Sequence, residues 1–116
     1  YNPQQFRAGQ SPASFEKVKD YLKGYSNVHL YKGIFPATAK TIKNKKFSFV
    51  SLDVDIYQST LDALNFFYPK MKEGGIIISH DYANSPGVKK AIDKFLKDKP
   101  EPVIEVGYQC MIIKVK

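Results

Sequence analysis

The sequence predicts an α/β fold in which a mainly parallel sheet is completed by an antiparallel hairpin at its C-terminal end. Segments with the apolar pattern of strands alternate with segments of helical periodicity, an order that is typical of parallel sheets. The runs at 47–55 and 75–79 are almost continuously apolar, which favours strands buried on both faces, the first at the centre of the sheet. Two later runs, 102–106 and 110–115, are separated by three residues and predict the hairpin.

The N-terminal part is expected to hold a loop, two helices and one strand. Residues 1–13 are rich in proline, glutamine and glycine, which is typical of a loop. Ser14 is expected to cap a helix over 14–25, where apolar residues recur at helical spacing. Alternating residues predict a short strand over 27–33, and a loop with a short helix is expected over 34–46.

Two further helices are expected beside the apolar runs. The first covers 59–71, with Ser59 or Thr60 as its N-cap and an apolar face of helical spacing. Glycines 74 and 75 are expected to turn the chain into the strand at 75–79. Pro86 is expected to begin the second helix, because proline is favoured in the first helical turn.

The length indicates one domain, 1–116, and the cysteine content fits a cytosolic protein. A chain of 116 residues is enough for one domain with a real core and short for two. No apolar run approaches the roughly 20 residues of a membrane helix, and no leader pattern is visible. Cys110 is the single cysteine and lies in an apolar strand pattern, which indicates a small buried hydrophobe. We therefore expect a cytoplasmic protein without a membrane partner.

The positive charge is confined to the first part of the chain. The net charge is +7, all of it in residues 1–50, whereas residues 51–116 carry equal numbers of acidic and basic side chains. A basic half can indicate nucleic-acid binding. However, the lysines lie mostly on expected helices and loops, and aromatic residues are not interleaved as in a stacking platform. We therefore expect no nucleic-acid partner.

Carboxylates follow two of the predicted strands. Asp53 and Asp55 end the first apolar run, and strand alternation would place both on one side, with Cα atoms about 6.5 Å apart. The next strand ends at His80 and Asp81. The carboxyl ends of strands are where ligands bind in open α/β sheets. If the strands are neighbours, three carboxylates and an imidazole converge, and a divalent cation such as Mg²⁺, Ca²⁺ or Mn²⁺ would relieve their repulsion.

A purely structural interpretation of these carboxylates also exists. An aspartate after a strand is often the N-cap of the next helix. Asp55 would then cap the turn at IYQST, and Asp81 would cap the loop over 82–85. The whole set at matching ends of consecutive strands favours the cation site.

The stretch LDVDIYQSTLDALNFFYPKMKEGGIIISHDYANSPGVKKAIDKF resembles the macrocin O-methyltransferase family. The upstream pieces FRAGQSPASFEKVKDYL and LYKGIFPAT resemble the middle region of the same family. The resemblance covers most of the chain and weakens over the last hairpin. It implies a Rossmann-like class I methyltransferase fold and a metal-dependent enzyme that uses S-adenosylmethionine to methylate a hydroxyl of a small molecule, a sugar or a natural product.

By position, the resemblance assigns the metal site to Asp53, His80 and Asp81, with Mg²⁺ as the expected ion. It assigns to Asp55 the role of taking the proton of the substrate hydroxyl. The family usually has two adjacent aspartates where this chain has His80 and Asp81. An imidazole lowers the negative charge and favours softer metals, so the sequence leaves the identity of the metal open.

The family's glycine-rich turn for the methyl donor, and its acidic residue for the donor's ribose, match nothing in this chain. The sequence therefore predicts an incomplete fold, the C-terminal part of a methyltransferase domain, with no assignable donor-binding residue. The strand that ends at Asp53 would lose one neighbour, and an unpaired strand favours association, so we expect a homo-oligomer. The chain alone is expected to be inactive.

Two other functions stay open at this point. Phosphatases of the haloacid-dehalogenase type also have a strand that ends in two aspartates, where Asp53 would be the nucleophile and Asp55 the acid and base. That motif normally stands near the start of its domain, whereas here a helix, a strand and a loop precede it. The third possibility is a non-catalytic fragment or interaction module.

Overall fold

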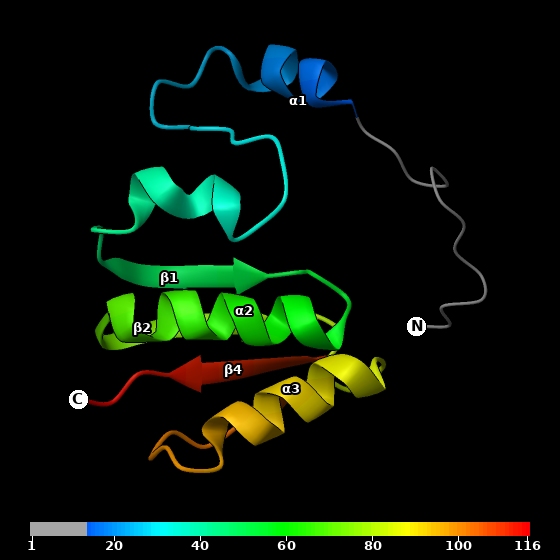
Figure 1. The fold of residues 1–116 in the computed structure, drawn as a ribbon, viewed down its shortest axis with the longest axis vertical. Helices are drawn as coiled ribbons and strands as arrows, with labels where there is room; N and C mark the ends of the chain where they lie inside the picture. Colours follow the sequence, from blue (N-terminus) through cyan, green and yellow to red (C-terminus); the bar gives the residue numbers. More distant parts are fainter. Residues whose placement is uncertain (1–13) are drawn as a thin grey trace.

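A four-stranded mixed sheet with two helices packed on one face forms the body of the protein (Figure 1). The structure, a computed structural model, describes residues 14–116, so the loop expected over 1–13 lies outside the described residues. The strands are β1 (Phe47–Leu52), β2 (Met71–Ser79), β3 (Ile104–Val106) and β4 (Gln109–Ile113), in the order β1-β2-β4-β3. β1 and β2 are parallel, and β4 is antiparallel to both β2 and β3, which confirms the predicted class and hairpin.

Helices α2 (Tyr57–Phe67) and α3 (Pro86–Leu96) cover the sheet and enclose the core. Fully buried side chains come from both helices and from the two inner strands, among them Leu64, Ile92, Ile77 and Ile112. Pro86 begins α3 as predicted, because its fixed φ suits the first turn of a helix.

The start of α2 differs from the prediction. The helix begins at Tyr57, so Thr60 lies inside it and neither Ser59 nor Thr60 is the N-cap. The Thr60 hydroxyl donates to the carbonyl oxygen of Ile56 at 2.7 Å, a bond within the first turn. The Ile56 side chain cannot accept hydrogen bonds, so α2 has no side-chain cap. A short 3₁₀ helix, η3 (Tyr68–Lys70), continues α2 to the start of β2.

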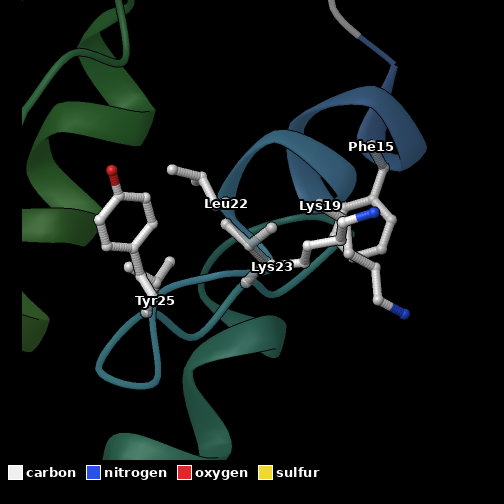
Figure 2. A pocket seen from close by; sticks show the side chains of 7 residues that line it. Phe15, Lys19, Leu22, Lys23 and Tyr25 are labelled. Carbon is white, nitrogen blue, oxygen red and sulfur yellow. The ribbon is translucent and has the colours of Figure 1, made fainter.

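Helix α1 (Phe15–Leu22) stands apart from the sheet (Figure 1). Its predicted cap is confirmed, since the Ser14 hydroxyl oxygen accepts from the N–H of Lys17 at 3.1 Å. None of its residues is buried. Its apolar side chains face the segment that follows, across a hollow of about 380 Å³ (Figure 2), lined by Phe15, Lys19, Leu22, Lys23, Tyr25, Val28 and Leu30. The short helix expected next is the 3₁₀ helix η2 (Ala37–Ile42).

Three predictions about strands are wrong. Residues 27–33 do not form a strand. Val28 and Tyr31 are both exposed, and the segment pairs with no strand within residues 14–116. The glycines at 74 and 75 lie inside β2 rather than in a turn before it. Gly74 has a φ of +77°, which glycine adopts without strain, and the register of β1 against β2 shifts nearby.

The third error concerns the burial of β1. It is the outer strand of the described sheet, as expected for a strand that lacks one neighbour, but the prediction that both of its faces are buried is wrong. Its side chains alternate, with Val50 and Leu52 buried under the helices and Phe49 57% exposed on the other face. The apolar run suggested burial on both faces, but α2 and α3 cover one face only. Among the strands of residues 14–116, β1 thus has an exposed apolar side chain and one edge without a paired strand.

Cys110 is confirmed as a buried small hydrophobe. Its side chain is fully buried in β4, and burial raises the pKa of its thiol to about 11. At neutral pH the nucleophilic thiolate is therefore almost absent. Over residues 14–116, no helix is both long and apolar enough to span a bilayer.

Candidate active site

The carboxyl ends of β1 and β2 meet at one edge of the sheet. The strands are parallel neighbours, with Leu52 opposite Ser79 at their ends. The N–H of His80 then donates to the carbonyl oxygen of Leu52 at 2.9 Å. Asp53 follows β1 directly, and His80 with Asp81 follows β2, so the sheet brings together residues that lie 27 or more positions apart.

Asp53, His80 and Asp81 form a compact cluster of potential metal ligands. The Nδ1 atom of His80 lies 3.1 Å from Oδ2 of Asp81 and 3.7 Å from Oδ1 of Asp53. One ligand atom from each residue lies within 4.8 Å of the others. The side chains of Asp53 and His80 are 67% and 48% exposed, whereas that of Asp81 is 10% exposed and forms the inner wall.

These separations fit a shared cation. Ligand atoms that bind one ion at about 2.0–2.4 Å are at most about 4.8 Å apart, and the three ligand atoms here lie within 4.8 Å of one another. Two carboxylates and one imidazole form a mixed set of ligands. The carboxylate oxygens suit Mg²⁺ and Mn²⁺, and the imidazole nitrogen suits softer ions. The chemistry and spacing of the side chains therefore suit a divalent cation open to solvent on one side.

The four ionisable groups influence one another. Partial burial, together with a hydrogen bond to Asp81 and the charge of Asp53, raises the pKa of Asp55. Hydrogen bonding to Asp81 and its charge raise the pKa of His80. Burial alone would raise the pKa of Asp81, but its hydrogen bonds with His80 and Asp55 outweigh this and lower it. Asp55 thus lies beside the ligand cluster as the carboxylate that most readily accepts a proton.

Two of the aspartates have an unusual backbone. Asp55 and Asp81 have φ values of 60° and 61°, and they are the two non-glycine residues with positive φ in the described part of the chain. At Asp55, the N–H of Ile56 donates to the carbonyl oxygen of Val54 at 2.7 Å, which closes a tight three-residue turn. Such backbone is sparsely populated and persists where its surroundings hold it.

This backbone corrects two expectations. β1 ends at Leu52, so strand alternation does not explain why Asp53 and Asp55 face the same region; the turn at Asp55 does. The simple capping interpretation is also wrong for Asp55, because α2 has Ile56 at its N-cap position and no side-chain cap. At Asp81, the N–H groups of Asn84 and Ser85 bond to its backbone oxygen, which leaves its carboxylate facing His80 and Asp55.

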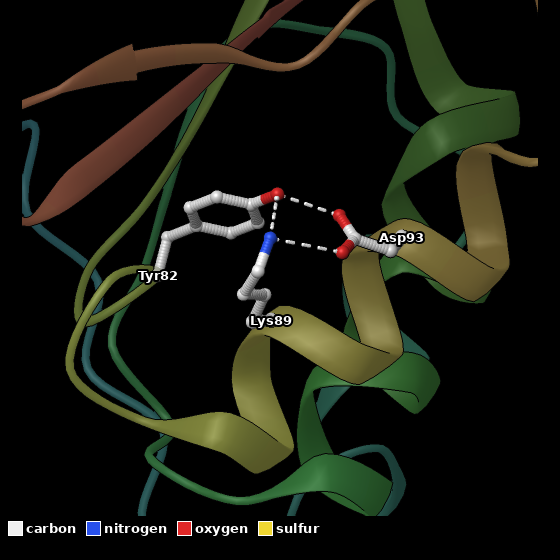
Figure 3. A network of polar contacts seen from close by, with 3 residues as sticks. All are labelled: Tyr82, Lys89 and Asp93. Atoms are coloured by element: carbon white, nitrogen blue, oxygen red, sulfur yellow. Dashed lines mark hydrogen bonds and ion pairs between the residues drawn. The ribbon is translucent and has the colours of Figure 1, made fainter.

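The loop that follows β2 is anchored to α3 by a polar network (Figure 3). The hydroxyl of Tyr82 donates to Oδ1 of Asp93 at 2.6 Å, and Lys89 Nζ donates to Tyr82 at 3.0 Å and to Asp93 at 3.1 Å. Burial and the bond to Asp93 raise the pKa of Tyr82, so its hydroxyl stays a donor at neutral pH. The ring of Tyr82 is buried, and this network holds the residue that follows Asp81.

Two contacts of this loop were not predicted from the sequence. The N–H of Ala83 donates to the carbonyl oxygen of Tyr108 at 3.2 Å, which joins the loop to the turn of the hairpin. The Ser85 hydroxyl donates to the carbonyl oxygen of Asp55 at 3.2 Å, across 30 positions of sequence. A serine directly before Pro86 was the available signal, but at that position serine predicts a helix cap rather than a contact with another loop.

Comparisons with known proteins agree on one family. Residues 10–114 match the family model "Macrocin-O-methyltransferase (TylF)". The chain is 33% identical over 86 residues to demethyldecarbamoylnovobiocin O-methyltransferase of Streptomyces niveus, a match covering 71% of this chain and 33% of that protein. It is also 36% identical over 72 residues to 8-demethyl-8-(2,3-dimethoxy-alpha-L-rhamnosyl)-tetracenomycin-C 4'-O-methyltransferase of Streptomyces olivaceus. This match covers 59% of this chain and 28% of that protein.

Solved structures agree with these matches. The O-methyltransferase NovP superposes with a TM-score of 0.77 and 26% identity, over 89% of this chain and 46% of NovP. The chain therefore spans about a third of the length of the curated relatives it matches and about half of NovP.

Proposed function

The chain belongs to the macrocin O-methyltransferase family, and from this premise we propose that the full-length protein methylates a hydroxyl of a small molecule with the help of a divalent cation. The observation that carries the proposal is the cluster at the ends of β1 and β2. Its three potential ligands lie beside a third carboxylate, that of Asp55, whose pKa is raised. A cation site next to a proton acceptor is the arrangement that activation of a hydroxyl requires.

In this proposal Asp53, His80 and Asp81 hold the cation, with Mg²⁺ as the expected ion. When bound, the cation would lower the pKa of a hydroxyl group placed beside it. Asp81 is the most buried of the three side chains, so it fixes the inner side of the site, and Asp53 and His80 leave the outer side open. The opening is where an acceptor molecule has room to approach.

Asp55 is the proposed general base. Its carboxylate lies next to Asp81 and Asp53, and its raised pKa favours uptake of a proton. Proton transfer by a positioned carboxylate contributes roughly 10²–10⁴-fold to a rate. Removal of the hydroxyl proton leaves an oxygen nucleophile, which forms a bond to the methyl carbon as the bond from that carbon to its donor breaks.

The names of the relatives support a class of acceptor. One is named for demethyldecarbamoylnovobiocin and the other for a rhamnosyl derivative of tetracenomycin-C, whose name includes a sugar. We therefore propose a sugar or natural-product hydroxyl as the acceptor and S-adenosylmethionine as the donor. The family match leaves no support for the phosphatase alternative, in which Asp53 would be the nucleophile.

A direct assay tests this function. The full-length protein is incubated with methyl-labelled S-adenosylmethionine and a panel of glycosylated natural products that carry free hydroxyl groups. We expect label in the product, loss of transfer after treatment with EDTA and recovery when Mg²⁺ or Mn²⁺ is restored. Transfer that persists unchanged after complete removal of divalent cations would contradict the proposed role of the cluster.

We also propose that residues 1–116 are the C-terminal part of the methyltransferase domain. The chain covers about a third of its curated relatives, and its sequence has no glycine-rich turn after a strand for the donor. β1 has an unpaired edge and the exposed Phe49 among the described strands, so the isolated chain is expected to form homo-oligomers.

The isolated chain is accordingly expected to bind S-adenosylmethionine no better than millimolar. Losing several buried hydrogen bonds, each worth roughly 0.5–1.5 kcal/mol, moves a micromolar site into that range. Calorimetric titration of residues 1–116 with the donor, alongside sedimentation analysis, measures both affinity and association. A monomer with a micromolar dissociation constant would show that donor-binding residues lie within this chain.

A further inference from the structure

Ser85 occupies the N-cap position of α3 but does not cap the helix. Serine is favoured there because its oxygen accepts a hydrogen bond from an N–H of the first turn. In α3 no such bond exists, and the Ser85 hydroxyl instead donates to the carbonyl oxygen of Asp55 at 3.2 Å. Ser85 is 6% exposed, so this contact is largely shielded from bulk water.

The same residue also holds the second loop of the site. The N–H of Ser85 donates to the carbonyl oxygen of Asp81 at 2.8 Å. Ser85 therefore contacts the backbone of both aspartates that have positive φ, by its hydroxyl at one and its N–H at the other. Its own carbonyl oxygen accepts from the N–H of Lys89, which fixes Ser85 to the first turn of α3.

We propose that Ser85 is a positioning residue, whose hydroxyl fixes the turn at Asp55 relative to the loop that carries Asp81. The inference rests on the proposed function, in which Asp55 is the base and Asp81 a cation ligand. The hydroxyl contact and the N–H contact of Ser85 are expected to have different effects. The hydroxyl orients Asp55 alone, whereas the N–H, which every residue except proline shares, orients Asp81. Removing the hydroxyl should thus affect proton transfer and leave cation binding intact.

Three variants of the full-length protein separate these roles. Ser85→Ala removes the hydroxyl and keeps the N–H. Ser85→Thr keeps the hydroxyl, and the extended backbone at this position (φ −114°, ψ 109°) suits a β-branched residue. Ser14→Ala is the matched control, since Ser14 is also an N-cap serine, but one whose hydroxyl oxygen caps its own helix.

For Ser85→Ala we expect kcat to fall about 10-fold, as loss of one hydrogen bond implies, with cation affinity and acceptor KM within twofold of the unmodified protein. Amide exchange at Ile56, whose N–H closes the turn at Asp55, should become several-fold faster. Ser85→Thr should restore kcat and exchange, and Ser14→Ala should change neither.

Each alternative result is decisive. Equal kcat and equal exchange in Ser85→Ala would overturn the inference, as would a parallel loss of cation affinity, since the hydroxyl would then act on the ligands rather than on Asp55. An unmodified protein that transfers no methyl group to any hydroxyl acceptor would instead overturn the proposed function. Exchange at Ile56 is measured without turnover, so it still reports whether the hydroxyl holds the turn.

Discussion

Asp55→Asn is expected to lower methyl transfer by the full-length protein by about 100-fold or more, the contribution of a positioned base at the low end of its range. Asparagine has nearly the shape of aspartate and tolerates the positive φ of this position, so the turn at Asp55 should survive. The amide cannot accept a proton at neutral pH, and this is the property that the substitution removes. Initial rates at saturating donor and acceptor measure the effect.

The free energy of unfolding of Asp55→Asn shows whether lower methyl transfer results from loss of the base or from loss of the fold. The pKa of Asp55 is raised in the folded protein, so its favourable contribution is present when it is protonated and is lost as pH rises through that pKa. The charged carboxylate of Asp55 is therefore less favourable in the folded protein, beside Asp53 and Asp81, than in the unfolded chain. Asp55→Asn should leave the cation-free protein at least as stable as the unmodified one, measured by urea denaturation.

Asp20→Asn is the control for the loss of a carboxylate. Asp20 pairs with Lys23 on the surface of α1, where such pairs contribute little, so turnover should not change. If Asp55→Asn retains normal turnover, Asp55 is not the base.

Asp81→Asn is expected to weaken cation binding by about 100-fold or more. Even residues that only support metal ligands typically contribute 10–100-fold to affinity, and Asp81 is proposed to be a ligand itself. Its side chain is the most buried of the cluster and lies 3.1 Å from Nδ1 of His80. Calorimetric titration with Mg²⁺ and Mn²⁺ gives the affinity, with Asp20→Asn again as the control.

The same variant has a readout that needs no cation. Asp81 is the main cause of the raised pKa of His80, through a hydrogen bond and its charge. In Asp81→Asn the carboxylate is gone, so the pKa of His80 should fall, which NMR titration of the imidazole measures. A lower His80 pKa with unchanged cation affinity would confirm the contact between the two residues and exclude Asp81 as a ligand.

The sequence predicts those site residues that follow a recognisable pattern and misses those whose role depends on contacts between distant loops. Asp53, His80 and Asp81 could be found because they lie within two residues of the ends of apolar strands, and parallel neighbours bring such positions to one edge. The positive φ of Asp55 and the bond from Ser85 leave no pattern in a single sequence. They depend on how two loops, 30 positions apart in the sequence, meet at the edge of the sheet.

The errors in the fold have a common cause. The alternation at 27–33 and the apolar run of β1 describe side chains, whereas a strand also needs a neighbour and a covered face. Gly74 has the same ambiguity, since a glycine with positive φ serves a turn or an irregularity inside a strand equally well. Helix α3 was predicted from its first residue because proline, spacing and apolar face all agree.

The isolation of α1 has a consequence for how this sequence can evolve. Substitutions destabilise a protein mainly by disturbing buried residues, and α1 contributes none to the core. Its surface, including the side chains around the hollow in Figure 2, can therefore diverge with little cost to folding, while the loops that carry Asp53 and Asp81 remain tied to the sheet. Substitutions in α1 should therefore cost the described part of the chain less stability than substitutions in α2 and α3, which supply its core.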